Sequence, residues 1–515
     1  MKYTCVDPAE FLYQDIAEYK SGTDSIHILT PRGTYACAQI MLMEGTDPAK
    51  ISCTGWQPEI YEMVAIPVDQ TVGITEENRR LHTPERVGPF KVYDCLKPSD
   101  GTICFEEGTA AVYFSLWIPK DADAGIIHGA VSIGEIEITV TIEVSEAVVP
   151  DESLSVLMLY VKKKVCEYHN VEENSAEFDQ LETAYLTQLR RMHQNTLWMP
   201  ETNRFPVATA LEDHRYAFDF SEMEAFIEKA MSLGFTKVYQ RLGFRQSWDK
   251  STILVGGIPC MSFEGYCYLA QLLPALSNFL QQHGWLDRFM LSILDEAREN
   301  NAMEYRALCN IVRKFAPGIK LIDAMSYGYV DGSMDICVIM SDEYEKHRDD
   351  YETYRRYGDE LWYYDCCFPR GYGYINRFLD YPLLSTRYHG WGNYAYNLIG
   401  YLHWAANHYQ PNQNPFTESC PLHRNADHVN RMPAGDTHIM YPGKDGPWMS
   451  VRMENYRAGF EEYEMLRTLA EQDKALADSI CKQVFRKFND VEYNPCVFRA
   501  ARNELIRALE KIASK

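Results

Sequence analysis

The sequence predicts an N-terminal β-sandwich, then a (β/α)8 TIM-type barrel, with C-terminal helices packed on the barrel. Before residue 150, short strand-like runs are separated by turn residues, and helical periodicity is scarce. From residue 155 onward, eight strand-like runs alternate with helical or looped segments over roughly the length that a barrel needs. From residue 454, the chain carries helical periodicity and charge pairs.

The predicted sandwich spans residues 1–150. Its final hairpin, residues 124–133 and 136–144, alternates apolar and polar residues around a tight turn at Gly134. Strict alternation is typical of a strand with one face on a core and the other in water. Earlier strands are predicted at 25–30, 35–43, 87–96 and 111–118, and residues 148–152 are predicted as a linker.

The predicted barrel spans residues 151–410. An open doubly wound sheet is the competing fold, but it would carry a Gly-rich phosphate loop after its first strand. Residues 161–165, Val-Lys-Lys-Lys-Val, contain no glycine, so the barrel is favoured. Helices are predicted at 177–193 and from residues 221, 264, 302, 342 and 382. Strands are predicted at 155–161, 196–199, 236–241, 289–294, 320–323, 336–340, 361–365 and 400–404.

Residues 411–515 are predicted to form a long loop and a helical extension on the barrel. The loop, residues 410–433, is rich in Asn and Pro, and loops of that length tend to be functional or mobile. Arg452, Glu454 and Glu462 are expected to hold the tail helix to the barrel.

Composition narrows the class of protein. The chain has 515 residues, which predicts two or three domains. Its net charge of -23 argues against a nucleic-acid partner, because binding phosphate needs clustered Lys and Arg. No apolar run is long enough to cross a bilayer, so no membrane partner is expected. No export signal is visible, and the 15 cysteines show no paired spacing; both suggest a cytoplasmic location with reduced thiols. The oligomeric state is open.

The most informative motif is the acid pair Asp295-Glu296. It directly follows the apolar run of the predicted fourth barrel strand, residues 289–294. Catalytic groups of such barrels sit at the C-terminal ends of the strands, so two acids here suggest proton chemistry. The dipeptide alone is also compatible with a solvated strand end whose acids cap the next helix.

Around this pair the chain resembles glycoside hydrolase family 123. The resemblance covers the barrel and the tail, and in the N-terminal part only Leu116-Trp-Ile-Pro and the closing Gly-rich hairpin share it. The matching segments are LWYYDCCFPR at 361–370, FLDYPL at 378–383, GYLHW at 400–404, MYPGKDGP at 440–447 and VRMENYRAGFEEYE at 451–464. One departure is that the family usually follows the acid pair with proline, where this chain has Ala297.

The resemblance implies a retaining, substrate-assisted β-N-acetylhexosaminidase that acts on β-linked N-acetylgalactosamine. Ordinary retaining glycosidases flank the sugar with two carboxyl groups about 5 Å apart. Sequence neighbours cannot easily sit on opposite faces of one ring, but they can sit side by side, one at the leaving oxygen and one beside the 2-acetamido group. Glu296 would be the general acid and then the base, and Asp295 would orient the acetamide as an oxazoline forms. The charge of Asp295 should raise the pKa of Glu296.

Further substrate-binding candidates come from the strand ends. Trp404 follows the eighth strand and could stack on the sugar, with Trp198 as an alternative. Strand alternation allows only part of the trio Tyr363, Tyr364 and Asp365 to face a pocket. The remaining candidates are Tyr329, Arg241 and His403, and for Arg241 a structural salt bridge is the competing role.

No cofactor and no metal are expected. His389, His403, His408, His423, His428 and His438 crowd one region, but none has the helical spacing with carboxylate support that metal hydrolases use.

Two other functions remain compatible with the sequence. One is a catalytically degenerate carbohydrate-binding protein. The other is a retaining glycosidase for sugars without an acetamido group, with Asp365 or Asp323 as a separate nucleophile.

Overall fold

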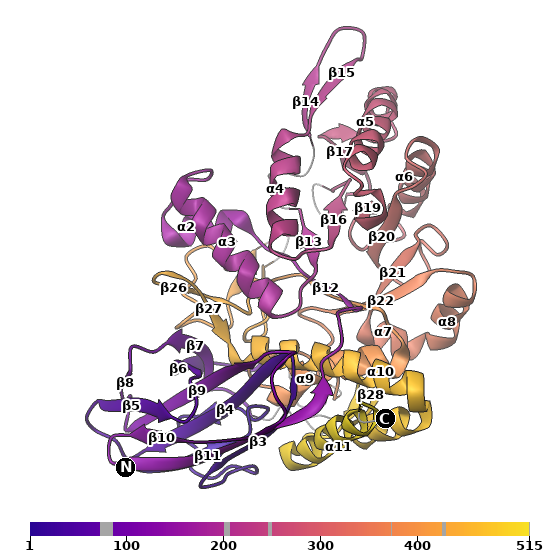
Figure 1. Ribbon diagram of the computed structural model, residues 1–515. Helices are drawn as coiled ribbons and strands as arrows, with labels where there is room; N and C mark the ends of the chain where they lie inside the picture. The colour runs from indigo at the N-terminus through magenta and orange to yellow at the C-terminus, as the bar shows by residue number, and fades with distance from the viewer. Residues whose placement is uncertain (73–85, 200–205, 246–249, 372, 425–428, 514–515) are drawn as a thin grey trace.

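The computed structural model describes residues 1–72, 86–199, 206–245, 250–371, 373–424 and 429–513. Figure 1 shows two layered sheets at the N-terminal end, a barrel of strands and helices in the middle of the chain, and C-terminal helices beside both. None of the described helices is long and apolar enough to cross a membrane.

A nearly closed barrel of eight parallel strands forms the middle of the molecule. The strand order is β12-β23-β22-β21-β20-β19-β16-β13, and each predicted barrel strand overlaps one of these. The bounds are β12 (Ser155–Met158), β13 (Thr196–Trp198), β16 (Lys237–Arg241), β19 (Phe289–Ser292), β20 (Lys320–Met325), β21 (Ile336–Met340), β22 (Glu360–Asp365) and β23 (Gly400–His403). The sequence therefore predicted this barrel correctly.

Side-chain amides close the seam between the two end strands, β12 and β13. Gln194 accepts a hydrogen bond from the Met158 backbone N–H at 3.1 Å and returns one to the Met158 carbonyl at 3.0 Å. Asn195 bonds the preceding part of the same strand. It accepts a hydrogen bond from the Val156 backbone N–H at 3.1 Å and donates one to the Leu154 carbonyl at 2.7 Å. These two residues thus supply the backbone pairing that the missing ladder would have provided.

Helices surround the barrel, and apolar side chains fill it. Leu157, Met290, Ile322, Trp362 and Leu402 belong to one buried cluster inside it. Ser175 and Ser262 cap two of the helices by accepting backbone N–H groups three residues on. The helices are α2 (Lys162–His169), α3 (Ala176–Arg191), α4 (Ser221–Ser232), α5 (Phe263–Gln282), η2 (Leu286–Arg288), α6 (Ala302–Phe315), α7 (Ser341–Lys346), α8 (Arg348–Arg356) and α9 (Leu383–Tyr396). Two hairpins extend loops after β13 and β16: β14 (Val207–Ala210) with β15 (Tyr216–Asp219), and β17 (Leu254–Val255) with β18 (Ile258–Pro259).

Residues 1–150 form two sheets that share an apolar core, to which Ile40 and Leu42 of one sheet and Ile138, Val140 and Ile142 of the other contribute. The larger sheet has the order β1-β4-β9-β6-β7 and continues into the C-terminal strands β27 (Gly446–Ser450) and β26 (Tyr441–Gly443). The smaller sheet has the order β3-β11-β10-β5-β8. The larger comprises β1 (Lys2–Val6), β4 (Thr34–Met43), β9 (Thr109–Ile118), β6 (Glu59–Val68), β7 (Phe90–Pro98), and β2 (Leu12–Tyr13) paired with β7. The smaller comprises β3 (Ile26–Arg32), β11 (Ile136–Val148), β10 (Gly125–Ile133), β5 (Ala49–Thr54) and β8 (Thr102–Ile103).

The C-terminal part contacts both the barrel and the N-terminal sheets. The sequence predicted contact with the barrel only. The hairpin β26 (Tyr441–Gly443) and β27 (Gly446–Ser450) extends the larger N-terminal sheet by pairing with β7. Helix α10 (Val451–Val484) packs closely on α9, because Gly390 and Gly459 meet where a Cβ would lie 1.9 Å from the opposing carbonyl. Helix α11 (Pro495–Ala513) contacts β11 and β3. The remaining short strands are β24 (Leu422–Arg424), β25 (Val429–Arg431), β28 (Phe485–Lys487) and β29 (Asp490–Val491).

Candidate active site

The acid pair lies in a turn that directly follows β19, at the C-terminal end of the barrel, as the sequence predicted. After Ser292 the chain leaves the regular ladder, although the carbonyls of Ser292 and Ile293 still accept the N–H groups of Leu242 and Gly243 at 2.7 and 3.0 Å. Glu296 adopts a left-handed backbone conformation with φ of 47°. The Glu296 backbone N–H donates to the carbonyl of Ala324, on the neighbouring strand β20, at 3.0 Å.

Glu296 is held by a tyrosine from across the barrel mouth. The Tyr364 hydroxyl donates to Glu296 Oε1 at 2.7 Å, and Tyr364 belongs to the cluster inside the barrel. The glutamate side chain is 23% exposed. Burial and the adjacent charge of Asp295 raise the pKa of Glu296, while the Tyr364 hydrogen bond opposes that rise. A raised pKa suits a group that must hold a proton before it donates one.

Three arginines surround the acid pair. Arg241, at the end of β16, lies 3.3 Å from Asp295 Oδ2, which agrees with the salt bridge weighed for it. Arg298 lies 3.7 Å from Glu296 Oε2. Arg245 donates to the Glu296 carbonyl at 3.3 Å. The nearest charged partner of the Asp295 carboxylate is therefore a guanidinium at 3.3 Å, whereas the shortest contact of the Glu296 carboxylate is with a neutral hydroxyl.

Trp404 is a half-buried ring that directly follows β23 at the same end of the barrel. Its indole N–H faces both carboxylate oxygens of Asp436 at 3.3 Å. The rings of His408 and His423 lie 4.9 and 5.9 Å from it. Asp436 is fully buried and comes from the C-terminal loop, so that loop fixes the orientation of Trp404.

Strand alternation separates the other candidates from the acid pair. Tyr363, Asp365 and His403 are fully buried and lie on the outer face of their strands, toward α9 and α10. The Tyr363 hydroxyl donates to the His389 carbonyl at 2.9 Å, and Tyr401 donates to Asp365 at 2.7 Å. Burial raises the pKa of Asp365 to about 8. Of the trio at 363–365, only Tyr364 reaches the acid pair.

The remaining aromatic candidates differ in exposure. Trp198 is buried inside the barrel, where the Arg241 guanidinium lies 5.3 Å from its ring. It therefore supports the arginine that pairs with Asp295. Tyr329 is 38% exposed, and its carbonyl accepts from Arg306 at 2.9 Å. Among the described residues, no hydrogen bond or ion pair joins Tyr329 to the acid pair.

Comparison with known proteins identifies the family. The model of the glycoside hydrolase 123 catalytic domain matches residues 205–469, more than half of the chain. The chain belongs to glycoside hydrolase family 123. It is a glycoside hydrolase, as the sequence predicted.

A solved structure supports the fold over the full length. A family 123 glycoside hydrolase from Clostridium perfringens, described in work on glycolipid glycan hydrolysis, aligns with a TM-score of 0.74 at 13% identity, covering 100% of this chain and 98% of that one. A Bacteroides ovatus family 5 xyloglucanase aligns with a TM-score of 0.34 at 9% identity, covering 85% of this chain and 98% of that one. A search of curated proteins finds no match to this chain.

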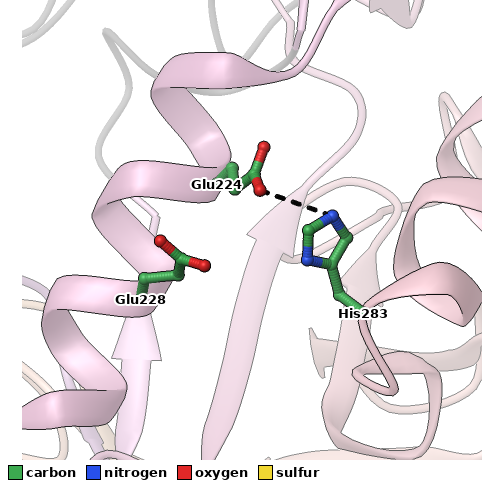
Figure 2. A group of neighbouring side chains, drawn as sticks. All are labelled: Glu224, Glu228 and His283. Carbon is green, nitrogen blue, oxygen red and sulfur yellow. Dashed lines mark ion pairs between the residues drawn. The ribbon is translucent and has the colours of Figure 1, made fainter.

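In this family 123 chain, one group of described side chains has the spacing to share a metal ion. Ligand atoms of Glu224, Glu228 and His283 lie within 4.8 Å of one another, and His283 Nε2 is 3.6 Å from Glu224 Oε1 (Figure 2). Figure 2 shows both glutamates on successive turns of α4, facing the histidine. The two glutamates belong to α4 and His283 directly follows α5, so the acid pair contributes nothing to the group. The clustered histidines that the sequence highlighted do not form such a group among the described residues; His428 lies outside them.

Sequence reasoning missed two acids that support the site. Asp436 orients Trp404, and Asp323 bonds the turn that carries the acid pair. Asp436 lies more than 100 residues after the pair, and nothing in its local sequence indicates a partner. Asp323 was considered only as the end of a predicted strand and as an alternative nucleophile, and its bonds to the turn were not foreseen.

Proposed function

We propose that this family 123 hydrolase is a retaining β-N-acetylhexosaminidase that cleaves β-linked N-acetylgalactosamine with help from the substrate's acetamido group. The observation that carries the proposal is the environment of the adjacent acids. Asp295 lies beside a guanidinium, whereas Glu296 accepts from Tyr364 and has a raised pKa. Two neighbouring carboxyl groups with such different partners suit two different roles.

In the first step, Glu296 would donate its proton to the glycosidic oxygen as the C1–O bond breaks. The acetamido oxygen attacks C1 from the opposite face, and Asp295 accepts the hydrogen bond of the acetamido N–H as an oxazoline forms. The negative charge of Asp295 stabilises the positive charge that develops on this group. The leaving alcohol departs with the proton from Glu296.

In the second step, Glu296 would act as the base. It takes a proton from a water molecule that attacks C1, and the oxazoline opens to restore the acetamide. Two displacements at C1 give net retention of configuration. Glu296 ends the cycle protonated.

The buried acids argue against a separate carboxylate nucleophile. Asp323 and Asp365 were the candidates for that role, and both side chains are fully inaccessible. Asp323 accepts from Tyr305 and two backbone N–H groups, and Asp365 accepts from Tyr401. Neither carboxylate faces open space in which a sugar ring could lie.

Trp404 is the side chain we assign to the apolar face of the sugar. Its ring is partly exposed at the C-terminal end of the barrel, and the bond to Asp436 fixes its orientation. Carbohydrate C–H groups pack well on an indole face because the ring is large, apolar and flat.

We assign residues 1–150 to a β-sandwich domain and residues 151–410 to the catalytic barrel. The shared apolar core of the two N-terminal sheets supports the sandwich. Residues 411–515 would then be an extension that supplies Asp436 to the site and α10 to the contact between the two domains.

Hydrolysis of three aryl glycosides tests the proposal. Aryl β-N-acetylgalactosaminide, β-N-acetylglucosaminide and β-galactoside should be compared, with Glu296→Gln as the control. We expect release from the acetamido sugars only, and a loss of about 10²–10⁴-fold in kcat in Glu296→Gln. Release from plain galactoside would contradict the substrate-assisted mechanism. No release from any of the three, with binding to a glycan retained, would favour a degenerate carbohydrate-binding protein.

A further inference from the structure

A buried carboxylate on the neighbouring strand holds the turn that carries the acid pair. Asp323 lies on β20, and its Oδ2 accepts the backbone N–H groups of Ile293 and Leu294 at 2.9 and 3.1 Å. The same oxygen accepts the hydroxyl of Tyr305 from α6 at 2.6 Å. Its Oδ1 accepts the hydroxyl of Ser292. Four donors, from β19, the turn after it and α6, thus converge on one carboxylate.

Where the backbone pairing between β19 and β20 stops, this carboxylate replaces the backbone carbonyls as the hydrogen-bond acceptor. The register of the two strands ends with Leu291 paired to Leu321. Beyond it, the N–H groups of Ile293 and Leu294 bond to a side chain instead of to backbone carbonyls. The strand edge is regained when Glu296 N–H donates to Ala324 and Ala297 pairs with Met325.

The acid pair therefore lies in a short turn that is bonded to β20 at both of its ends. The Asp323 carboxylate fixes the start, and the backbone of Ala324 and Met325 fixes the end. Burial raises the pKa of Asp323 to about 6, but the carboxyl group accepts four hydrogen bonds from the segment around the turn and from α6, and these fix the start of the turn. Because the Glu296 backbone is left-handed, a loose start would let the pair relax away from this geometry.

Asp323 acts without touching the substrate. Its side chain is fully buried, and Tyr305 bonds it from the helical layer outside the barrel. The inner face of β20 is instead formed by Ile322 and Ala324, which belong to the cluster inside the barrel. Any influence on the reaction must pass through the turn.

We propose that Asp323 is a positioning residue that sets the placement of Asp295 and Glu296. Its catalytic consequence rests on the proposed function, whereas its hold on the turn can be measured independently. A displacement of about 1 Å in a catalytic group can cost on the order of 10²-fold in rate.

Hydrogen exchange tests the hold on the turn. In Asp323→Ala, amide exchange in a peptide covering residues 289–299 should rise strongly. The matched control is Asp335→Ala. Asp335 is another carboxylate that accepts a backbone N–H, that of Leu321 in β20 at 2.8 Å, but it does not bond the turn that carries the acid pair. Equal exchange of this peptide in the two variants would overturn the proposal.

Kinetics tests the consequence. Asp323→Ala should lower kcat about 10²-fold with KM nearly unchanged. Asp323→Asn should recover much of the rate, because its amide oxygen can still accept the two backbone N–H groups while its NH₂ faces the Ser292 hydroxyl. The Asn variant also keeps the test usable if the Ala variant does not fold.

The outcomes separate the two proposals. Faster exchange with full kcat in Asp323→Ala, or no recovery in Asp323→Asn, would overturn the positioning role. A wild-type protein that hydrolyses none of the aryl glycosides would refute the proposed function, and the exchange experiment would still decide whether Asp323 holds the turn.

Discussion

At the scale of single residues, the site depends on how the two neighbouring acids are made different. Arg241 lies beside Asp295, while Tyr364 bonds Glu296 through a neutral hydroxyl. Burial and the charge of Asp295 raise the pKa of Glu296. A raised pKa keeps a carboxyl group protonated to higher pH, which suits the role of general acid that we propose for Glu296.

Tyr364→Phe should move the basic limb of the pH–rate profile to higher pH. The tyrosine hydrogen bond lowers the pKa of Glu296, so its removal lets that pKa rise, and the general acid stays protonated to higher pH. The profile of kcat/KM measures this. Tyr363→Phe is the control, because that hydroxyl bonds His389 on the other side of the strand. An unchanged limb, or a shift to lower pH, would show that another group controls it.

Trp404→Ala should raise KM more than it lowers kcat. Loss of an aromatic platform removes about 1.5–3 kcal/mol of apolar burial, or about 10- to 150-fold in binding. Trp117→Ala is a suitable comparison, since that ring is 48% exposed on β9 of the N-terminal sheets. Equal KM values for the two variants would remove Trp404 from the binding site.

At the scale of elements, α10 joins the parts of the molecule through buried ion pairs. Arg452 bonds Asp94 of β7 at 2.9 Å, and both side chains are inaccessible. Glu454 pairs with Arg191, the last residue of the barrel helix α3, and Glu462 pairs with Arg387 of α9. The sequence suggested that all three residues hold α10 to the barrel. Arg452 does donate to the Arg377 carbonyl at 3.2 Å, but its ion-pair partner Asp94 lies in the N-terminal sheet, which the sequence did not predict.

Arg452→Ala should lower the free energy of unfolding by about 3–5 kcal/mol, because it leaves Asp94 buried without its partner. Urea denaturation measures the loss. Arg467→Ala, on the same helix but with a side chain 38% exposed, should cost less than about 1 kcal/mol. Similar losses in both variants would contradict a special role for the buried pair.

At the scale of the whole molecule, His193 joins the linker, the barrel and α10. Its Nδ1 lies 2.7 Å from Glu152, and its Nε2 lies 3.1 Å from Glu461. Burial alone would lower its pKa, but the hydrogen bonds to the two glutamates outweigh burial and raise the pKa to about 9. The imidazolium is therefore the form that the folded protein prefers.

Stability should fall as pH rises from 6.5 to about 9. A histidine whose pKa is higher in the folded than in the unfolded protein contributes its full stabilisation below the unfolded value, and that contribution is lost as pH rises through the folded value. Thermal unfolding across this range measures the effect. His193→Gln should flatten the dependence, whereas His27→Gln, on the exposed face of β3, should not. A wild-type melting temperature that does not decline over this pH range would contradict a stabilising role for the ion pairs of His193.

Much of this architecture could be predicted from the sequence, and the limits have physical causes. The eight barrel strands are apolar runs with clear boundaries, and the acid pair directly follows one of them. Which side of a strand Asp365 or His403 faces depends on the pleat at the strand's end, where periodicity no longer guides the prediction. The support from Asp323 and Asp436 arises from contacts between segments that only the folded chain brings together. The hairpin of β26 and β27 is short, so its pairing with β7 had no signal in the sequence.

The most direct test of the central claim is the rate of hydrolysis of aryl β-N-acetylgalactosaminides whose acetamido group carries zero, one, two or three fluorine atoms. Each fluorine makes the amide oxygen a poorer nucleophile. If that oxygen attacks C1 while Asp295 polarises the amide, kcat/KM should fall steeply along the series. A rate that is independent of fluorine content would contradict the account, because it would show that the acetamido group takes no part in breaking the bond.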